Sequence, residues 1–208
     1  MKKLILLSAT LLALENREFG NGEHEQPALS REIFMAVRAN NQDWLRSVMQ
    51  KNYKEEWWPD VINYRDPATL QSPLMMAVLS GLDIIVEILI SDINVQVLVP
   101  EKDGYTPMHG AGFQGRANII KIMMDPKKIW GRKIDPNIMH SDGYRPIHRA
   151  CWGMEQRHTD AVKAFIEVGV PFNVRDSRGR SCYDMTRNEE TKKFLREIME
   201  KMGIREEL

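Results

Sequence analysis

Two histidines of this chain stand in nearly identical contexts, and histidine is the residue most often used for acid–base chemistry. The chain reads DGYTPMHGA at 103–111 and DGYRPIHRA at 142–150, which places His109 and His148 in the same register. An enzyme needs a catalytic histidine once, whereas a stacked structural unit needs it in every copy. The duplication therefore favours a structural role for His109 and His148 over catalysis or metal binding.

A nucleophilic dyad is the catalytic alternative. Cys151 follows His148 by three positions, so the two share one face of a helical segment. A cysteine nucleophile also needs a group that orients the histidine and donors for an oxyanion. The sequence supplies neither a carboxylate at helical spacing nor a glycine-rich oxyanion motif. As an enzyme, the chain would have to build a pocket from its loops between His140, His148, His158 and Cys151.

Metal and redox chemistry have equally little support. HSD at 140–142 and RHTD at 157–160 lack the paired spacing of a zinc site. The chain has two cysteines, Cys151 and Cys182, too few for a disulfide-rich scaffold, and we expect two free, buried thiols. The sequence thus predicts no metal and no cofactor.

The charge balance restricts the class of partner. Of 208 residues, 29 are basic and 29 acidic, and 43% are hydrophobic, as in an ordinary globular protein. Phosphate backbones and anionic membranes require a concentrated positive field. We therefore expect neither nucleic acid nor a membrane as the main partner.

The motif around His109 recurs along the chain. TPMH at 106–109 matches RPIH at 145–148, SPLM at 72–75 and, more loosely, SCYD at 181–184. The apolar runs IIVEILI, IIKIMM and AVKAFI follow the first three copies, and IFMAVRANNQDWLRSVM, from position 33, keeps the helical pattern without the motif. Self-similarity at a period of 34–39 residues is typical of a repeat architecture.

These segments resemble ankyrin repeats, whose pattern is a β-turn at Asp-Gly, a Thr-Pro-Leu-His-x-Ala motif, two helices separated by a glycine turn, and an exit loop. Gly81 and Gly115 match the glycine turn. The resemblance covers residues 31–203 in about five units. It implies an all-α repeat protein, an ankyrin-like α-solenoid of helix-turn-helix units with β-turn loops. It also implies that His109 and His148 hydrogen-bond to neighbouring backbone from inside the stack.

The repeated residues suit the local structure that the resemblance implies. Gly104 and Gly143 tolerate the positive φ of a tight turn. Pro107 and Pro146 fit a first helical turn, where a missing N–H costs nothing. Thr106 can cap the helix that follows it.

Loop insertions and the chain ends complete the domain organisation. Extra residues fall in KNYKEEWWPDVINYRDP, DPKKIWGRKIDPN and CWGMEQRHTDA, and we expect loops there because loop length costs little free energy. Residues 1–14 read as a possible signal peptide, 15–30 as a polar linker, 31–203 as the repeat domain and 204–208 as a charged tail. An N-terminal helix docked on the fold is the alternative for residues 1–14.

The two ends also suggest a location. Lys2 and Lys3 precede an apolar run of eleven residues, Leu4 to Leu14, which is the length of a signal-peptide core. The final REEL resembles the tetrapeptides that retain proteins in the endoplasmic reticulum (ER). Ankyrin units, however, are commoner in the cytoplasm. The secretory pathway or ER lumen and the cytoplasm are both left open.

Ankyrin stacks bind through turn tips and the exposed ends of first helices, on the concave side, and register places those positions here. The residues before the Pro motif and those two places after the repeat alanine should each form a row. The partner-binding candidates are Tyr105, Tyr144, Phe113, Trp152, Leu79 and Arg180, with the four aromatic rings on one face. Trp57, Trp58 and the loop at Trp130 are secondary candidates; these tryptophans could instead fold the insertions onto the stack.

The leading hypothesis is a non-catalytic protein-interaction module or scaffold with no stable membrane insertion. A loop-built enzyme near His148 and Cys151, and a structural or inhibitory accessory subunit, are the alternatives. The fold is reused with unrelated ligands, so the sequence identifies neither the partner nor the oligomeric state.

Overall fold

The computed structural model describes residues 26–101 and 104–203 of the chain. The possible signal peptide, most of the predicted linker, Asp103 and the REEL tail lie outside these residues. All regular elements of the described part are α-helices. They are α2 (Gln26–Arg38), α3 (Gln42–Asn52), α4 (Trp58–Ile62), α5 (Pro73–Ser80), α6 (Asp83–Ile90), α7 (Pro107–Phe113), α8 (Ala117–Met124), α9 (Pro146–Cys151), α10 (Gln156–Glu167), α11 (Cys182–Met185) and α12 (Glu189–Lys201).

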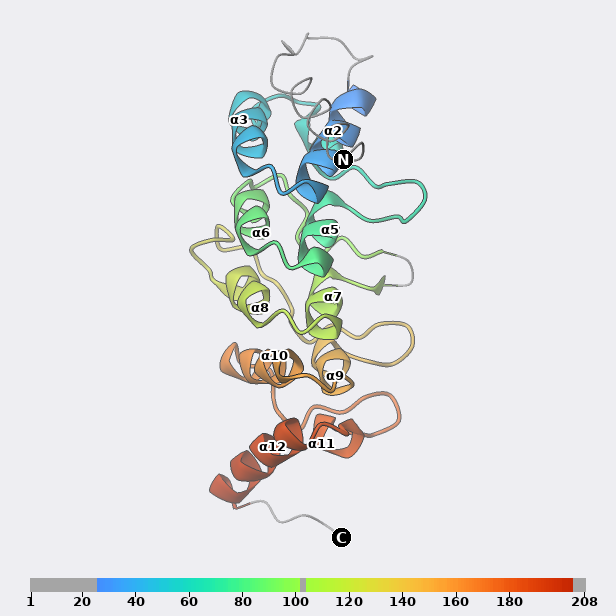
Figure 1. The fold of residues 1–208 in the computed structure, drawn as a ribbon, viewed down its shortest axis with the longest axis vertical. Coiled ribbons are helices and arrows are strands. Elements are labelled where there is room, and N and C mark those ends of the chain that lie inside the picture. The colour runs from blue at the N-terminus through green and yellow to red at the C-terminus, as the bar shows by residue number, and fades with distance from the viewer. Residues whose placement is uncertain (1–25, 102–103, 204–208) are drawn as a thin grey trace, which may run out of the picture.

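The helices stack as successive pairs (Figure 1). The first helices α2, α5, α7, α9 and α11 form one layer, and the second helices α3, α6, α8, α10 and α12 form the other. Each connection between pairs has a loop that projects on the side of the first helices, one above another, and the connection after α8 has a further loop on the side of the second helices. The all-α repeat architecture predicted from the sequence is confirmed.

Proline and glycine set the ends of the first helices. Helices α5, α7 and α9 begin at Pro73, Pro107 and Pro146. The backbone N–H that proline lacks would have no acceptor at this position of a helix, and the fixed φ of proline suits the first turn. The Ser72 hydroxyl accepts a hydrogen bond from the Met75 backbone N–H at 3.1 Å and caps α5. Gly81 follows α5 with φ of 74°, a left-handed conformation that glycine adopts without strain.

The first helix begins earlier than the sequence predicted. α2 starts at Gln26, so residues 26–30 do not belong to a polar linker. Leu29 and Ser30 are buried, and Pro27 lies in the first turn, where the helix tolerates it. The first insertion also carries structure of its own, the short helix α4.

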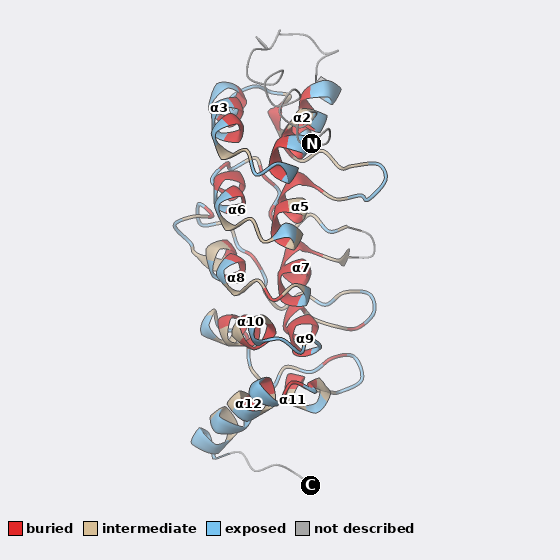
Figure 2. Cartoon of the chain, viewed as in Figure 1, coloured by how far each residue is buried: buried red, intermediate tan, exposed pale blue. Residues whose placement is uncertain are grey.

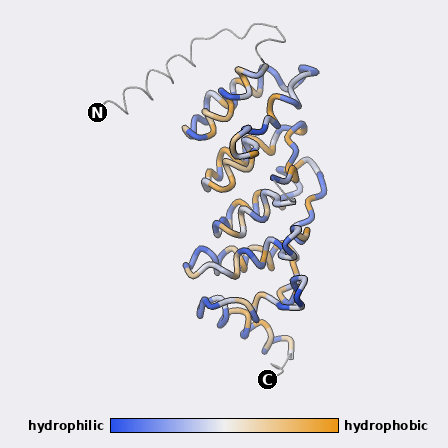
Figure 3. The backbone as a smooth tube through the Cα atoms, turned by 90° about the vertical axis from the view of Figure 1, so that its right-hand side faces the viewer, coloured by the Kyte–Doolittle hydropathy of each residue, from blue (hydrophilic) through white to orange (hydrophobic). Residues whose placement is uncertain are grey.

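One continuous core runs between the two helix layers (Figure 2). The apolar residues recur along every helix pair in the view turned by 90° (Figure 3). Each pair covers the apolar face of the next, so burial is shared along the whole stack. No helix in residues 26–101 or 104–203 is both long and apolar enough to cross a membrane.

The two cysteines correct a sequence-based prediction. Cys151 at the end of α9 and Cys182 at the start of α11 form a disulfide, with Cα atoms 5.5 Å apart. Both side chains are fully buried. They are therefore not free thiols, and the bond joins the first helices of the last two units. The spacing alone did not reveal the pairing, because the stacking places the residues next to each other.

Candidate functional site

Arg149 lies at the centre of an aromatic cluster on the side of the first helices. Its guanidinium carbon is 5.5 Å from the ring centre of Tyr105, 5.3 Å from that of Tyr144 and 4.7 Å from that of Trp152. The rings of Tyr144 and Trp152 meet edge to face, with centroids 4.8 Å apart. A guanidinium within about 6 Å of an aromatic ring is attracted to its face. One arginine thus joins three rings from two neighbouring units.

A carboxylate holds Arg149 from the turn side. Asp142 Oδ2 accepts a hydrogen bond from Arg149 Nη2 at 2.5 Å, and Asp142 Oδ1 lies 2.8 Å from His140 Nδ1. Burial acts to raise the pKa of Asp142, but hydrogen bonds from His140 and Arg149 outweigh it and hold this pKa below its usual range. Asp142 is therefore ionised and balances the buried Arg149 charge.

Arg180 is tied into the same surface. Its guanidinium donates to the Tyr144 hydroxyl at 2.9 Å and to Asp176 at 2.9 and 3.0 Å. Asp176 is buried and also accepts from the backbone N–H groups of Arg178 and Arg180. The geometry makes Arg180 a support for the Tyr144 ring.

The six predicted partner-binding residues are not equally placed. Trp152 is 39% exposed and joins Tyr144 and Arg149, whereas Tyr105 and Tyr144 are half-buried. Phe113 is 49% exposed at the end of α7, but no ring contact in the described part of the chain joins it to the others. Leu79 is half-buried beside Gly110. The predicted row of four rings is thus three rings held by an arginine, with Phe113 apart.

Sequence reasoning missed Arg149. Its position corresponds to Met76 and Gly110 in the two preceding units, so register gave no reason to select it. The sequence does show that an uncharged residue in two units is replaced by an arginine in the unit that contains Asp142. The contact to Tyr105, from the preceding unit, depends on the stacking.

His109 and His148 link neighbouring units. His109 Nδ1 accepts from the Thr106 backbone N–H at 3.2 Å, and Nε2 lies 3.4 Å from the Tyr144 carbonyl oxygen. His148 repeats the pattern with the Arg145 N–H at 3.2 Å and the Val174 carbonyl at 3.0 Å. Each ring therefore contacts its own helix start and the loop of the next unit.

Burial fixes the charge of these histidines. It lowers the pKa of His109 to about 4 and also lowers the pKa of His148. Burial likewise raises the pKa of Tyr105 to about 12. At neutral pH both imidazoles are uncharged and Tyr105 keeps its proton, so these rings act as hydrogen-bonding and packing groups.

The residues of the alternative catalytic site are engaged in structural contacts, with His140 Nδ1 2.8 Å from Asp142 Oδ1. Cys151 is in the disulfide, His148 is fully buried, and the His158 Nε2 lies 3.2 Å from the Phe113 carbonyl. No cluster of three metal-ligating residues occurs in the part of the chain that the structure describes.

The secondary tryptophan candidates also separate. Trp58 is fully buried and its indole N–H donates to Asp92 at 2.6 Å, so it folds the first insertion onto the stack. Trp57 is half-buried against the same core. Trp130 is 64% exposed, and its indole N–H donates to the Ser91 carbonyl just beyond the end of α6.

A comparison with known protein families matches the central part of the helix stack. The family model for ankyrin repeats, in three copies, matches residues 74–176. The match begins at the second residue of α5, extends beyond α10, and includes the cluster of Tyr105, Tyr144 and Trp152.

Proposed function

We propose that this chain, which belongs to the ankyrin-repeat family, is a non-catalytic protein-interaction module whose partner docks on the turn tips and the adjoining ends of the first helices. Ankyrin repeats are generally protein–protein interaction modules. The observation that supports this site is the exposed Trp152 indole, held by Tyr144 and Arg149. Tryptophan, tyrosine and arginine are the residues that dominate binding energy at interfaces.

The order of this cluster favours it over a random exposed patch. Trp152 contacts a ring and a guanidinium, Arg149 is held by Asp142, and Tyr144 is held by Arg180. Side chains fixed before binding lose less conformational freedom on association. Tyr105 and Tyr144 support the Trp152 surface, and Phe113 and Leu79 extend the candidate surface along α7 and α5.

An enzyme built on His148 and Cys151 receives less support. A cysteine nucleophile needs a thiolate, and the disulfide with Cys182 occupies this sulfur. A structural or inhibitory accessory subunit would bind its partner through the same docking surface. It would differ from a scaffold in its effect on the partner and not in how it binds.

The experiment compares two exposed apolar residues on opposite layers. A partner is first captured by the wild-type chain and purified, and its Kd is measured by calorimetry for Trp152→Ala and Ile84→Ala. Loss of an anchoring tryptophan is expected to cost about 2 kcal/mol or more, roughly a thirtyfold weaker Kd. Ile84, 49% exposed on α6, is the control and should leave Kd unchanged. Equal effects of the two substitutions would contradict the proposed surface.

A further inference from the structure

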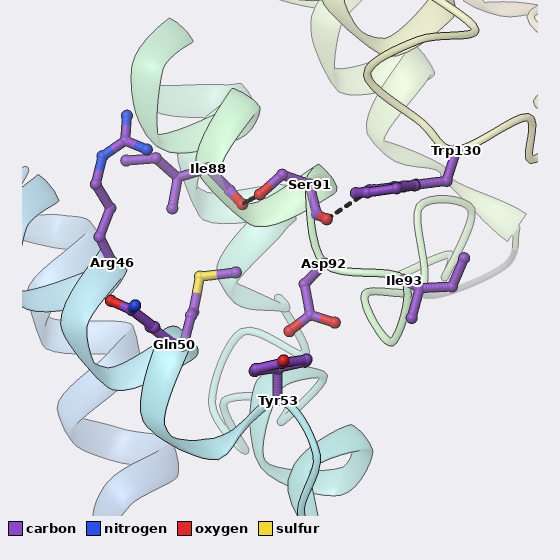
Figure 4. Close-up of a pocket in the computed structure, with 9 residues that line it drawn as sticks. Arg46, Gln50, Tyr53, Ile88, Ser91, Asp92, Ile93 and Trp130 are labelled. Carbon is purple, nitrogen blue, oxygen red and sulfur yellow. Dashed lines mark hydrogen bonds between the residues drawn. The ribbon is translucent and has the colours of Figure 1, made fainter.

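Two of the insertions meet at one cavity on the layer of second helices (Figure 4). The cavity has a volume of about 700 Å³ and lies between α3, the end of α6 and the loop after α8. Tyr53, the third residue of the first insertion, lines it, as does Trp130 from the third unit's inserted loop. The stack itself does not require either insertion, so their convergence needs a separate explanation.

The cavity is lined by both buried and exposed apolar residues. Met49 and Ile88 are buried in its lining, whereas Ile93 and Trp130 are 62% and 64% exposed. A volume of a few hundred to about 1,000 Å³ with an apolar lining is typical of small-ligand sites. The cavity therefore offers an apolar surface of the size of a small organic molecule.

The structure holds the Trp130 wall in place. The Trp130 indole N–H donates to the Ser91 carbonyl at 2.6 Å. Arg132 donates to the carbonyls of Ile90, Asp92 and Val95 beyond the end of α6, at 2.5 Å for Val95. These bonds fasten the inserted loop across the preceding unit. A wall that is fixed in advance adds affinity for whatever fills the cavity.

The polar groups of the cavity favour an anion. Arg46 lines it and is exposed, and no described residue forms an ion pair or hydrogen bond with its guanidinium. Asp92 is buried, and its two carboxylate oxygens accept from Trp58 and from Asn94, so it does not pair with Arg46. In Figure 4 Arg46 extends from α3 on the far side of Ile88 from Asp92.

The inserted loop adds further positive charge. Residues 125–135 carry four cations, Lys127, Lys128, Arg132 and Lys133, and two anions, Asp125 and Asp135, which leaves a formal net charge of +2. Glu87 pairs with Lys128 at 2.8 Å, and Arg132 is engaged with carbonyl oxygens. Exposed Lys127 and Lys133 leave the loop with positive charge beside an apolar cavity.

We propose that this cavity binds a small amphipathic organic anion, with the apolar body against Trp130, Ile88 and Met49 and the anionic group at Arg46. Residues of α3 and α6 line the site, whereas Trp152 follows α9. These helices lie in opposite layers (Figure 1). It is separate from the proposed protein-docking surface and does not depend on that proposal. Carboxylates and sulfonates with a hydrocarbon or aromatic body have this chemistry.

The test uses 1-anilinonaphthalene-8-sulfonate as the probe, because it combines an aromatic body with a fixed anion. Fluorescence titration of the full chain should saturate at one probe per chain, and laurate should displace the probe. Arg46→Glu should weaken probe binding at least tenfold. Arg178→Glu makes the same charge change at an exposed turn-tip position and should leave the probe affinity unchanged.

A second variant tests the apolar wall. Trp130 has φ of 55°, and asparagine tolerates this conformation better than alanine, so Trp130→Asn removes the indole with the least backbone strain. It should also weaken the probe at least tenfold while the far-UV circular dichroism stays native. Non-saturable binding, failure of laurate to compete, or equal affinity of Arg46→Glu and wild type would overturn the proposal. Arg46 is exposed and has no ion pair or hydrogen bond within residues 26–101 and 104–203, so its variant remains decisive if Trp130→Asn fails to fold.

Discussion

Cys151 and Cys182 join α9 to α11 through a disulfide, with their Cα atoms 5.5 Å apart. The bond spans 31 positions of sequence and is fully buried. Replacing both residues by alanine is expected to lower the free energy of unfolding by about 3–4 kcal/mol, because the unfolded chain regains the freedom that the cross-link removes. Urea unfolding followed by circular dichroism measures the change.

Reduction provides the matched control for this prediction. Dithiothreitol should lower the urea midpoint of the wild type and leave Cys151→Ala/Cys182→Ala unaffected. Two results together would show that the bond does not form. The urea midpoint of the wild type would be the same with and without reductant, and a thiol reagent would label two cysteines in the chain unfolded without reductant.

The pKa of His109 makes the fold sensitive to acid. This pKa is about 4 in the folded chain, against about 6.5 for an exposed histidine. Between these values the unfolded chain binds a proton that the folded chain does not. The stability that comes from keeping His109 neutral is therefore intact above about pH 6.5 and decreases as the pH falls. Near pH 4 this effect should lower the free energy of unfolding by about 2–3 kcal/mol.

His109→Gln separates this titration from the hydrogen bond. Glutamine at the third helical position can accept from the cap residue's N–H, and it does not titrate. We expect the variant to be less stable than the wild type at pH 7.5 but to lose less stability between pH 6.5 and 4. His148, whose pKa burial also lowers, and carboxylates such as Asp142, whose pKa is lowered, despite burial, by hydrogen bonds, contribute to the slope that remains. An unchanged slope in urea unfolding would rule out His109 as the source.

Arg149 and Asp142 should be energetically coupled. Arg149 is buried and Asp142 is 39% exposed in its side chain, so solvent screens part of their attraction. A double-mutant cycle with Asp142→Asn and Arg149→Met is expected to give a coupling of about 0.5–1.5 kcal/mol. Urea midpoints of the four proteins measure it. The matched cycle with Glu155 and Arg157, an exposed pair, should give a smaller value, and a zero coupling for Asp142 would remove it as the support of Arg149.

The sequence motif predicted the helix starts well because their physics is local. A proline and a capping residue act within one turn, so Pro107 and Pro146 locate α7 and α9 without knowledge of the rest of the fold. The contacts between units were harder to predict. Arg149 reaches Tyr105 across the stack, and Trp130 contacts Ser91 from 39 residues away. Such contacts depend on how the units are superposed and on how an insertion folds.

The disulfide repeats a contact that the structure also makes between the two preceding units. Gly112 and Cys151 hold the same place in their repeats, because each is the sixth residue when the proline of the motif is counted as the first. Cys182 holds the place of that proline, which is Pro146 in the preceding unit. A β-carbon at Gly112 would lie 2.3 Å from the Pro146 carbonyl oxygen. The same two positions therefore meet at both interfaces, once as a close backbone approach and once as a covalent bond. Once the contact between Gly112 and Pro146 is known, the register of the repeats places Cys151 next to Cys182.

Gly112 is expected to be the least replaceable glycine of α7. In Gly112→Ala the added carbon would collide with the Pro146 carbonyl, which belongs to backbone and cannot move without separating α7 from α9. We expect a loss of about 2–4 kcal/mol, which exceeds the gain of about 1 kcal/mol from better helix propensity. Gly110→Ala is the control in the same helix, because its new carbon would meet the side-chain ends of Leu79 and Met75 at 3.0 and 3.3 Å. Those ends can shift, so its stability should change by less than about 1 kcal/mol, and similar thermal midpoints for the two variants would mean that α7 and α9 are not in this close contact.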